Sequence, residues 1–145
     1  MPDRLTPQQR HKCMSHIRSK ATKPEILVRK WLWAHGYRYR LNVASVPGKP
    51  DIVMRKYRTA IFVNGCFWHG HDNCSLFVMP KSNPDYWPAK INRNRDRDQK
   101  HYRELAQAGW QVLVVWECHL AKDQIETTMQ SVAVALNQNL LKLVK

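Results

Sequence analysis

Two strongly apolar runs constrain the fold of this chain more than any other feature. TAIFVN (residues 59–64) is typical of a buried strand, and WQVLVVWEC (110–118) is the most hydrophobic strand candidate in the sequence. A helix is predicted between them, over about residues 88–108. A further strand is predicted at 51–54, joined to 59–64 by the tight turn RKYR (55–58). Helices are therefore expected to pack on a central sheet.

The N-terminal third adds two helices and a strand. Thr6-Pro7 is typical of a helix start and opens a short basic helix to about Ile17. The capping box TKPE (22–25) opens a second helix, which is expected to stop at Gly36. Residues 37–41 alternate between aromatic or apolar and basic side chains, a pattern that favours a half-buried strand.

The C-terminal tail, from about residue 122 to 144, is predicted to form one amphipathic helix packed on the sheet. Its apolar positions recur at spacings of three and four; they are Ile125, Met129, Val132, Leu136, Leu140 and Leu143. The element order α-α-β-β-β-α-β-α predicts a single α/β domain over residues 1–145, with a mixed sheet.

The charge balance indicates the class of partner. The 145 residues carry 24 Lys and Arg against 11 Asp and Glu, and residues 1–40 contain only Asp3 and Glu25 as acids. Such an excess favours binding of a polyanion, most often nucleic acid; the alternative is a basic surface that serves solubility. Neither a membrane-spanning segment nor a signal peptide is expected, which favours a cytoplasmic protein.

Cysteine and histidine spacing predicts a metal site. Cys66, His71 and Cys74 lie within nine residues, and Cys118 ends the second apolar run. A complete Cys/His set of this kind is typical of structural zinc, and it leaves no position for an activated water. Any catalytic chemistry must then lie elsewhere. The alternative is unligated thiols with Cys118 as a small buried side chain; Cys13 is expected to be unligated.

A second constellation contains carboxylates. Asp51 follows a proline at a strand start, and Glu25 lies in the preceding amphipathic helix, as in nuclease cores that bind Mg²⁺. The Glu-x-Lys that commonly follows is absent, and Asp51 as a turn-capping residue is the alternative. His69 is the candidate acid or base, unless it replaces His71 as the zinc ligand.

Three segments carry a resemblance to a known family. GKPDI (48–52), AIFVNGCFWHGH (60–71) and VLVVWEC (112–118), in this order, closely resemble the very short patch repair (Vsr) endonucleases. The resemblance extends from about Arg10 to Leu120. It implies a restriction-endonuclease-like fold and a DNA mismatch endonuclease.

The resemblance also implies roles for individual residues. Asp51 would bind the catalytic Mg²⁺ together with the backbone carbonyl of Val63, and His69 would activate the attacking water. Glu25 would support metal-bound water. The zinc set, Cys66, His71, Cys74 and Cys118, matches that of the family. At Val63-Asn64 this chain departs from the Thr-His pair of the best-known members, so Asn64, which can donate a hydrogen bond, is a catalytic-site candidate in place of that histidine. Asp72-Asn73 lengthens the zinc loop by one residue.

Aromatic residues next to the zinc ligands resemble those that the family inserts into the DNA stack. These are Phe67, Trp68 and Trp87, with Met14 of the basic N-terminal helix (residues 1–20) entering from the opposite groove. Unstacking costs a few kcal/mol per base step and least where pairing is poor, which favours mismatches. For Trp87 the alternative is ordinary core packing.

The function that the resemblance implies is a Mg²⁺-dependent nick in duplex DNA, 5′ of the thymine in a T·G mismatch formed by deamination of 5-methylcytosine. A cytosine-5 methyltransferase and a repair polymerase would be functional partners, and the protein would be a monomer. Basic residues of the N-terminal helix and of 90–103 would hold phosphates, although 90–103 is also typical of a solvated helix face. The alternatives are a restriction-type nuclease on matched DNA and a non-catalytic zinc-containing DNA-binding module.

Overall fold

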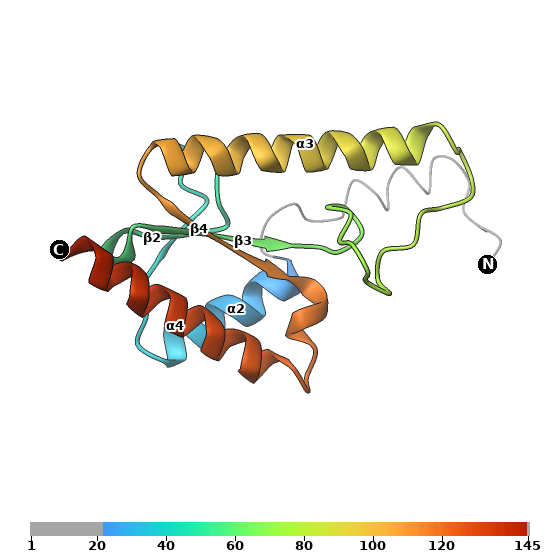
Figure 1. Ribbon diagram of the computed structural model, residues 1–145. Coiled ribbons are helices and arrows are strands. Elements are labelled where there is room, and N and C mark those ends of the chain that lie inside the picture. The colour runs from blue at the N-terminus through green and yellow to red at the C-terminus, as the bar shows by residue number, and fades with distance from the viewer. Residues whose placement is uncertain (1–21, 145) are drawn as a thin grey trace.

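The computed structural model describes residues 22–144, in which four strands form one mixed sheet (Figure 1). The elements in chain order are α2 (Lys23–Ala34), β1 (Arg40–Leu41), β2 (Ile52–Met54), the 3₁₀ turn η1 (Arg55–Tyr57), β3 (Thr59–Asn64), α3 (Tyr86–Gln107), β4 (Gln111–Trp116), the 3₁₀ turn η2 (Glu117–Leu120) and α4 (Ile125–Leu143). The predicted basic N-terminal helix, with Cys13 and Met14, lies outside the described residues.

The strands lie in the order β1-β2-β3-β4 across the sheet. β1, β2 and β3 are antiparallel neighbours, whereas β3 and β4 run parallel and are connected through α3. β3 therefore has a strand on each side, and all six of its residues are buried, as expected for a strand covered on both faces. The predicted α/β fold with a mixed sheet is confirmed.

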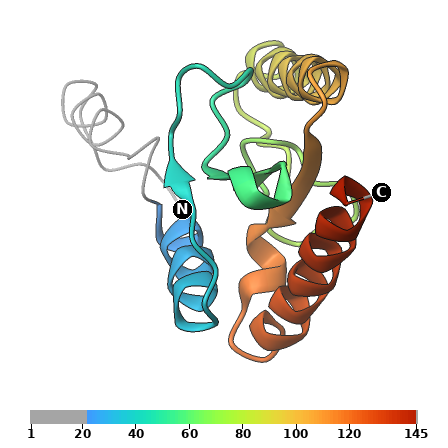
Figure 2. The ribbon, with the colours of Figure 1, turned by 90° about the vertical axis from the view of Figure 1, so that its left-hand side faces the viewer.

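The helices form a layer on each face of the sheet. α3 covers one face, and α2 and α4 share the other (Figures 1 and 2). Because side chains alternate along a strand, Ile61 and Val63 of β3 pack with α2 and α4, whereas Phe62 packs on the α3 side with Leu105. Asn64 continues the alternation of Phe62, so its side chain faces α3.

Local sequence signals place the helix ends. The Thr22 hydroxyl accepts a hydrogen bond from the Glu25 amide at 3.4 Å, and a proline lies in the first turn of α2, as the capping pattern predicts. Gly36 and Gly109 follow α2 and α3 with φ of +85° and +86°, the left-handed conformation that glycine adopts without strain. α3 begins at Tyr86, two residues before the predicted start.

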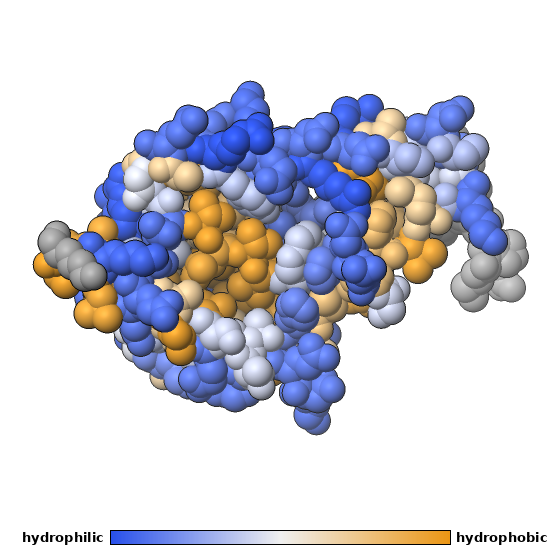
Figure 3. All heavy atoms as spheres, in the orientation of Figure 1, coloured by the Kyte–Doolittle hydropathy of each residue, from blue (hydrophilic) through white to orange (hydrophobic). Residues whose placement is uncertain are grey.

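Two strands differ from the expectation. β1 contains only Arg40 and Leu41, since Tyr37 and Tyr39 pack on the core from an irregular segment instead of pairing. β4 is the last strand of the described sheet, so most of its apolar side chains are only half-buried. An apolar face over β4 and α4 is visible in Figure 3.

α4 follows the predicted helix but not all of its predicted contacts. Met129, Val132 and Leu136 are buried against the sheet, whereas Leu143 is 51% exposed because it lies in the last turn, beyond the sheet. Asn139 is buried instead, and its amide donates to the Thr59 hydroxyl at 3.1 Å. None of the helices in residues 22–144 has the length and apolar character needed to cross a membrane.

Candidate active site

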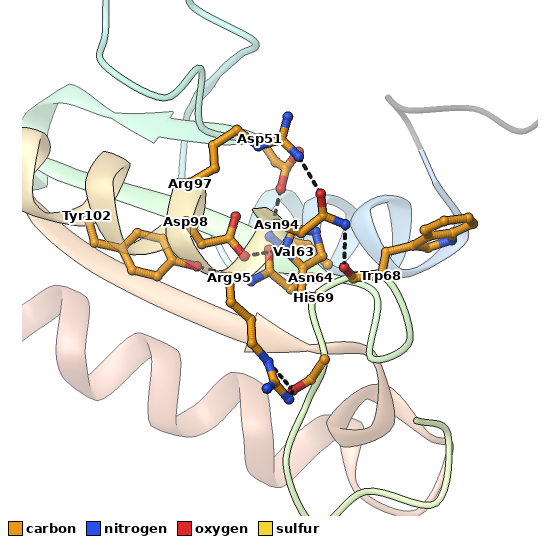
Figure 4. Close-up of polar contacts among 11 residues, drawn as sticks. Asp51, Val63, Asn64, Trp68, His69, Asn94, Arg95, Arg97, Asp98 and Tyr102 are labelled. Carbon is orange, nitrogen blue, oxygen red and sulfur yellow. Dashed lines mark hydrogen bonds and ion pairs between the residues drawn. The ribbon is translucent and has the colours of Figure 1, made fainter. Parts of the chain in front are cut away.

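At the C-terminal end of β3, a carboxylate is hydrogen-bonded to the strand backbone. Asp51 lies just before β2, opposite the end of β3, and its Oδ2 accepts a hydrogen bond from the amide of Val63 at 2.7 Å (Figure 4). The N–H and C=O of one strand residue point to the same side of the strand. The carbonyl of Val63 is therefore directed to the same side as Asp51. Val63 lies outside the paired part of β2 and β3, which ends at Ile52 and Ile61.

Burial makes the charge of Asp51 unfavourable. The pKa of Asp51 is raised to about 6: burial is the main cause, the Val63 amide lowers the pKa, the nearby negative charge of Glu25 raises it, and His69 lowers it. Because this pKa lies above that of an unfolded aspartate, ionisation of Asp51 opposes folding at neutral pH. The opposition disappears as the pH falls through 6 toward 4.

Glu25 adds a second unsatisfied charge. Its side chain is 2% exposed, and its Oε1 has no hydrogen-bond partner among residues 22–144. An orphaned carboxylate oxygen in the interior is costly unless a cation compensates it. A divalent ion such as Mg²⁺ prefers carboxylate and carbonyl oxygens, so the donors at Asp51, Val63 and Glu25 fit such an ion.

His69 lies beside this carboxylate pair and is oriented by an acid from α3. Its Nδ1 is 2.6 Å from Oδ2 of Asp98, whose side chain is 17% exposed. An ionised carboxylate can only accept, so this contact requires a proton on Nδ1, and in the neutral imidazole Nε2 then has the lone pair. The pair therefore has the arrangement of a general base with its orienting carboxylate.

Three polar residues of α3 face the site. Asn94, Asp98 and Tyr102 recur at intervals of four, so they lie on one side of the helix. These three residues were not predicted as site residues, because the sequence indicated only phosphate binding or a solvated helix face for residues 90–103. The available signal was their position between the buried apolar residues Ile91 and Leu105, which fixes that side of α3 against the sheet.

Asn64 occupies the end of β3 under this helix. It is 2% exposed, and its Nδ2 donates to the Tyr102 hydroxyl at 3.1 Å. The Tyr102 ring packs edge-on against Phe62, with ring centroids 5.2 Å apart. Figure 4 shows the phenol directed from α3 toward the centre of the site.

The loop after β3 forms a separate cluster of metal-binding side chains. One ligand atom from each of Cys66, His71, Cys74 and Cys118 lies within 4.8 Å of the others. The Cys118 amide also donates to the Cys66 sulfur at 3.3 Å. The four donors could hold a zinc ion, and they fit a closed tetrahedral set. Burial raises the pKa of the Cys66 thiol, so its thiolate is unfavourable without a cation.

The geometry separates the two histidines that spacing could not distinguish. His71 stacks on Trp116 with ring centroids 4.1 Å apart, and its Nδ1 lies 3.4 Å from the Cys118 sulfur. His69 points to Asp98 instead. The cluster that could hold zinc therefore contains His71, whereas His69 belongs to the carboxylate site.

An arginine of α3 fastens the same loop. Arg95 donates to the carbonyl of Gly70 and to Asp72, with 3.0 Å to the latter. Gly70 has φ of +60°, and a Cβ there would lie 2.5 Å from Nε of Arg95, so this close approach requires glycine. Arg95 is thus engaged within the protein, whereas Arg93 and Arg103 of the same basic stretch are exposed.

The aromatic residues of the loop gather around Phe67. Its ring centroid lies 5.2 Å from that of Trp68, 5.5 Å from Trp87 and 6.2 Å from Phe77. Trp87 is half-buried and belongs to neither core cluster, so it packs on the loop rather than in the core. Asn94 supports this group by donating to the Trp68 carbonyl at 2.8 Å.

The structure thus brings most predicted site residues to one end of the sheet. Asp51, Val63, Glu25 and His69 lie at the carboxylate site, and Asn64 faces Tyr102 beside it. Their catalytic roles stay predictions, as do the DNA contacts of the aromatic residues.

Several known proteins are similar to this chain over most of its length. A family model described as DNA mismatch endonuclease Vsr matches residues 2–75. The type II nicking enzyme V.XorIIP of Xanthomonas oryzae is 50% identical over 121 residues, which cover 83% of this chain and 88% of that protein. V.NmeAIP, a type II nicking enzyme of Neisseria meningitidis, is 50% identical over 125 residues, or 86% of this chain and 89% of its own length. The DNA mismatch endonuclease Vsr of Escherichia coli is 41% identical over 111 residues, or 77% and 70%.

The Cys/His cluster can be tested by removing one ligand. Cys118→Ser is expected to lower the zinc content of the purified protein and its melting temperature, because three donors hold the ion and the loop less firmly. Metal analysis and thermal denaturation measure the two effects. Cys13→Ser is the matched control and should change neither. Zinc content equal to wild type in the Cys118 variant would exclude this cysteine from the ligand set.

Proposed function

Because the chain belongs to the Vsr family of DNA mismatch endonucleases, we propose that it nicks one strand of duplex DNA 5′ of the thymine in a T·G mismatch. The mismatch would arise by deamination of 5-methylcytosine, and the nick would initiate very short patch repair. Family membership implies an endonuclease, and the names of several relatives describe nicking enzymes. The choice of mismatch and of strand is the proposal.

The observation that carries the proposal is the charge arrangement at the end of β3. Asp51 is fixed by the Val63 amide, and the buried Glu25 has an unsatisfied oxygen nearby. Asp51 and the Val63 carbonyl would hold Mg²⁺, with Glu25 accepting hydrogen bonds from its water ligands. When bound, Mg²⁺ supplies positive charge that polarises the phosphate and stabilises the leaving oxygen.

His69 would supply proton transfer. Asp98 holds its Nδ1, which leaves Nε2 to accept a proton from the water that attacks phosphorus. The new bond joins the water oxygen to phosphorus, and the bond from phosphorus to the leaving sugar oxygen breaks. Asp98 keeps the imidazole oriented and stabilises the imidazolium that forms.

The aromatic group supports a mismatch as the substrate. Phe67, Trp68 and Trp87 are half-buried side chains beside the site, and Phe67 contacts both tryptophans. Rings inserted between base steps pay an unstacking cost of a few kcal/mol, which is smallest at a poorly paired step. The Cys/His cluster would keep this loop rigid, so less ordering is needed when DNA binds.

The remaining parts of the proposal concern the setting of the reaction. The whole chain, residues 1–145, would act as one domain and as a monomer, with residues 1–20 contacting DNA and Met14 entering the opposite groove. The net charge of +13 supports binding to the phosphate backbone. A cytosine-5 methyltransferase would create the substrate and a repair polymerase would use the nick, in the bacterial cytoplasm near the nucleoid.

The proposed reaction can be tested with two labelled duplexes in Mg²⁺, one with T·G in a methylation-site context and one fully paired. A nick in the mismatched duplex alone is expected, and Asp51→Ala should abolish it because the principal metal ligand is lost. Denaturing electrophoresis locates the nick. Equal cutting of both duplexes would favour a restriction-type nuclease, and binding without cutting of either would favour a non-catalytic module.

The role of Asp98 can be tested separately. Asp98→Asn should lower the single-turnover rate by about tenfold or more, since an unoriented imidazole loses part of the 10²–10⁴-fold contribution of a general base. DNA affinity should stay near wild type, because Asp98 is proposed to act on the imidazole and not on DNA. Asp96→Asn, an exposed acid on the same helix, is the control. An unchanged rate would contradict the role of Asp98.

A further inference from the structure

We propose that Tyr102 donates a hydrogen bond to the scissile phosphate and that Asn64 positions it for this contact. The inference rests on the proposed endonuclease function, and it concerns the part of the site where this chain departs from the family pattern. An asparagine cannot exchange a proton near neutral pH. The Tyr102 hydroxyl that contacts Asn64 can, in contrast, both accept and donate a hydrogen bond.

The contact with Asn64 leaves the hydrogen of the Tyr102 hydroxyl available for a second hydrogen bond. The Asn64 amide donates to the phenol oxygen, which acts as the acceptor in that bond. A tyrosine hydroxyl carries one hydrogen of its own, and this hydrogen is then free for a second partner. Among residues 22–144, Asn64 is the partner found for the Tyr102 hydroxyl. A phosphate oxygen in the site would provide the missing acceptor.

The position of Tyr102 is fixed from two sides. Phe62 packs edge-on against its ring, and Asn64, which is 2% exposed, holds its oxygen. Both come from the same face of β3, the strand whose next-to-last residue holds Asp51. The hydroxyl is therefore part of a rigid arrangement and not the end of a mobile surface side chain, as required of a pre-organised donor.

The electrostatic surroundings keep this donor protonated. Burial raises the pKa of Tyr102; the hydrogen bond from Asn64 lowers it, whereas the charges of Asp98 and Asp51 raise it. That both aspartates influence Tyr102 agrees with a hydroxyl close to the carboxylate site. A neutral phenol beside two carboxylates does not repel a phosphate, and it donates at any pH at which the enzyme is expected to work.

Charge develops on phosphate oxygens during the reaction, so a fixed donor stabilises the transition state more than the bound substrate. Loss of such a donor should reduce the chemical rate while leaving DNA affinity almost unchanged. If Tyr102 only packs against the sheet, Tyr102→Phe should leave the rate unchanged, because this variant keeps the ring and its contact with Phe62.

The experiment compares Tyr102→Phe with wild type in single-turnover cleavage of a T·G duplex, with enzyme in excess. The rate is expected to fall by about 100-fold, the usual effect of removing one donor to developing charge. DNA affinity and melting temperature should stay near wild type. Tyr39→Phe is the matched control, since its half-buried hydroxyl donates to the Arg29 carbonyl away from the site.

Asn64→Ala and the double variant test the positioning role. If Asn64 acts through the Tyr102 hydroxyl, Asn64→Ala slows cleavage, and the double variant is no slower than Tyr102→Phe alone. Effects that multiply would overturn the role assigned to Asn64. A Tyr102→Phe rate within twofold of wild type would overturn the proposal while leaving the endonuclease function intact. A wild-type protein that does not cut the T·G duplex would overturn the proposed function itself.

Discussion

The hydrogen bond from the Val63 amide to Asp51 is the interaction on which the site depends. It joins the start of β2 to the end of β3 and holds a carboxylate where burial makes its charge unfavourable. Glu25, which lies in α2, is a second buried acid, and within the described part of the chain its Oε1 has no hydrogen-bond partner. Burial of these two carboxylates costs free energy of folding. The oxygen donors at this place fit a divalent cation, which would offset that cost. A carboxyl pKa raised by burial and a neighbouring like charge is characteristic of functional sites.

α3 and the loop after β3 build the rest of the site around this carboxylate. Neighbouring residues of the loop belong to different sites. Cys66 and His71 belong to the cluster that could hold zinc, whereas His69 contacts Asp98. α3 contacts both parts of the site: Arg95 donates to the backbone of the loop, and Asp98 contacts the imidazole of His69. Because the helix is anchored in the sheet core by Leu105, the loop and the carboxylate site share one rigid support.

The sequence predicted the elements well because their signals are local. Apolar alternation, proline in a first turn and glycine after a helix identify β3, α2 and α3 within a few residues. The short β1 and the half-buried β4 were not predictable, since they depend on which strands pair. Asp98 and Tyr102 were hidden in a helix rich in charged residues, where only contact with β3 distinguishes them. The choice between His69 and His71 likewise required the positions of Asp98 and Trp116.

The fold holds Asp51 as a buried carboxylate, and the oxygen donors around it fit a divalent cation that would stabilise its charge. The most direct test follows the carboxyl carbon of Asp51 by NMR during a pH titration, with and without Mg²⁺. A midpoint near pH 6 is expected without divalent cations, matching the raised pKa of Asp51, and a shift to lower pH is expected when Mg²⁺ is added. A midpoint close to that of an exposed aspartate, or one that Mg²⁺ does not move, would contradict a buried carboxylate stabilised by a cation.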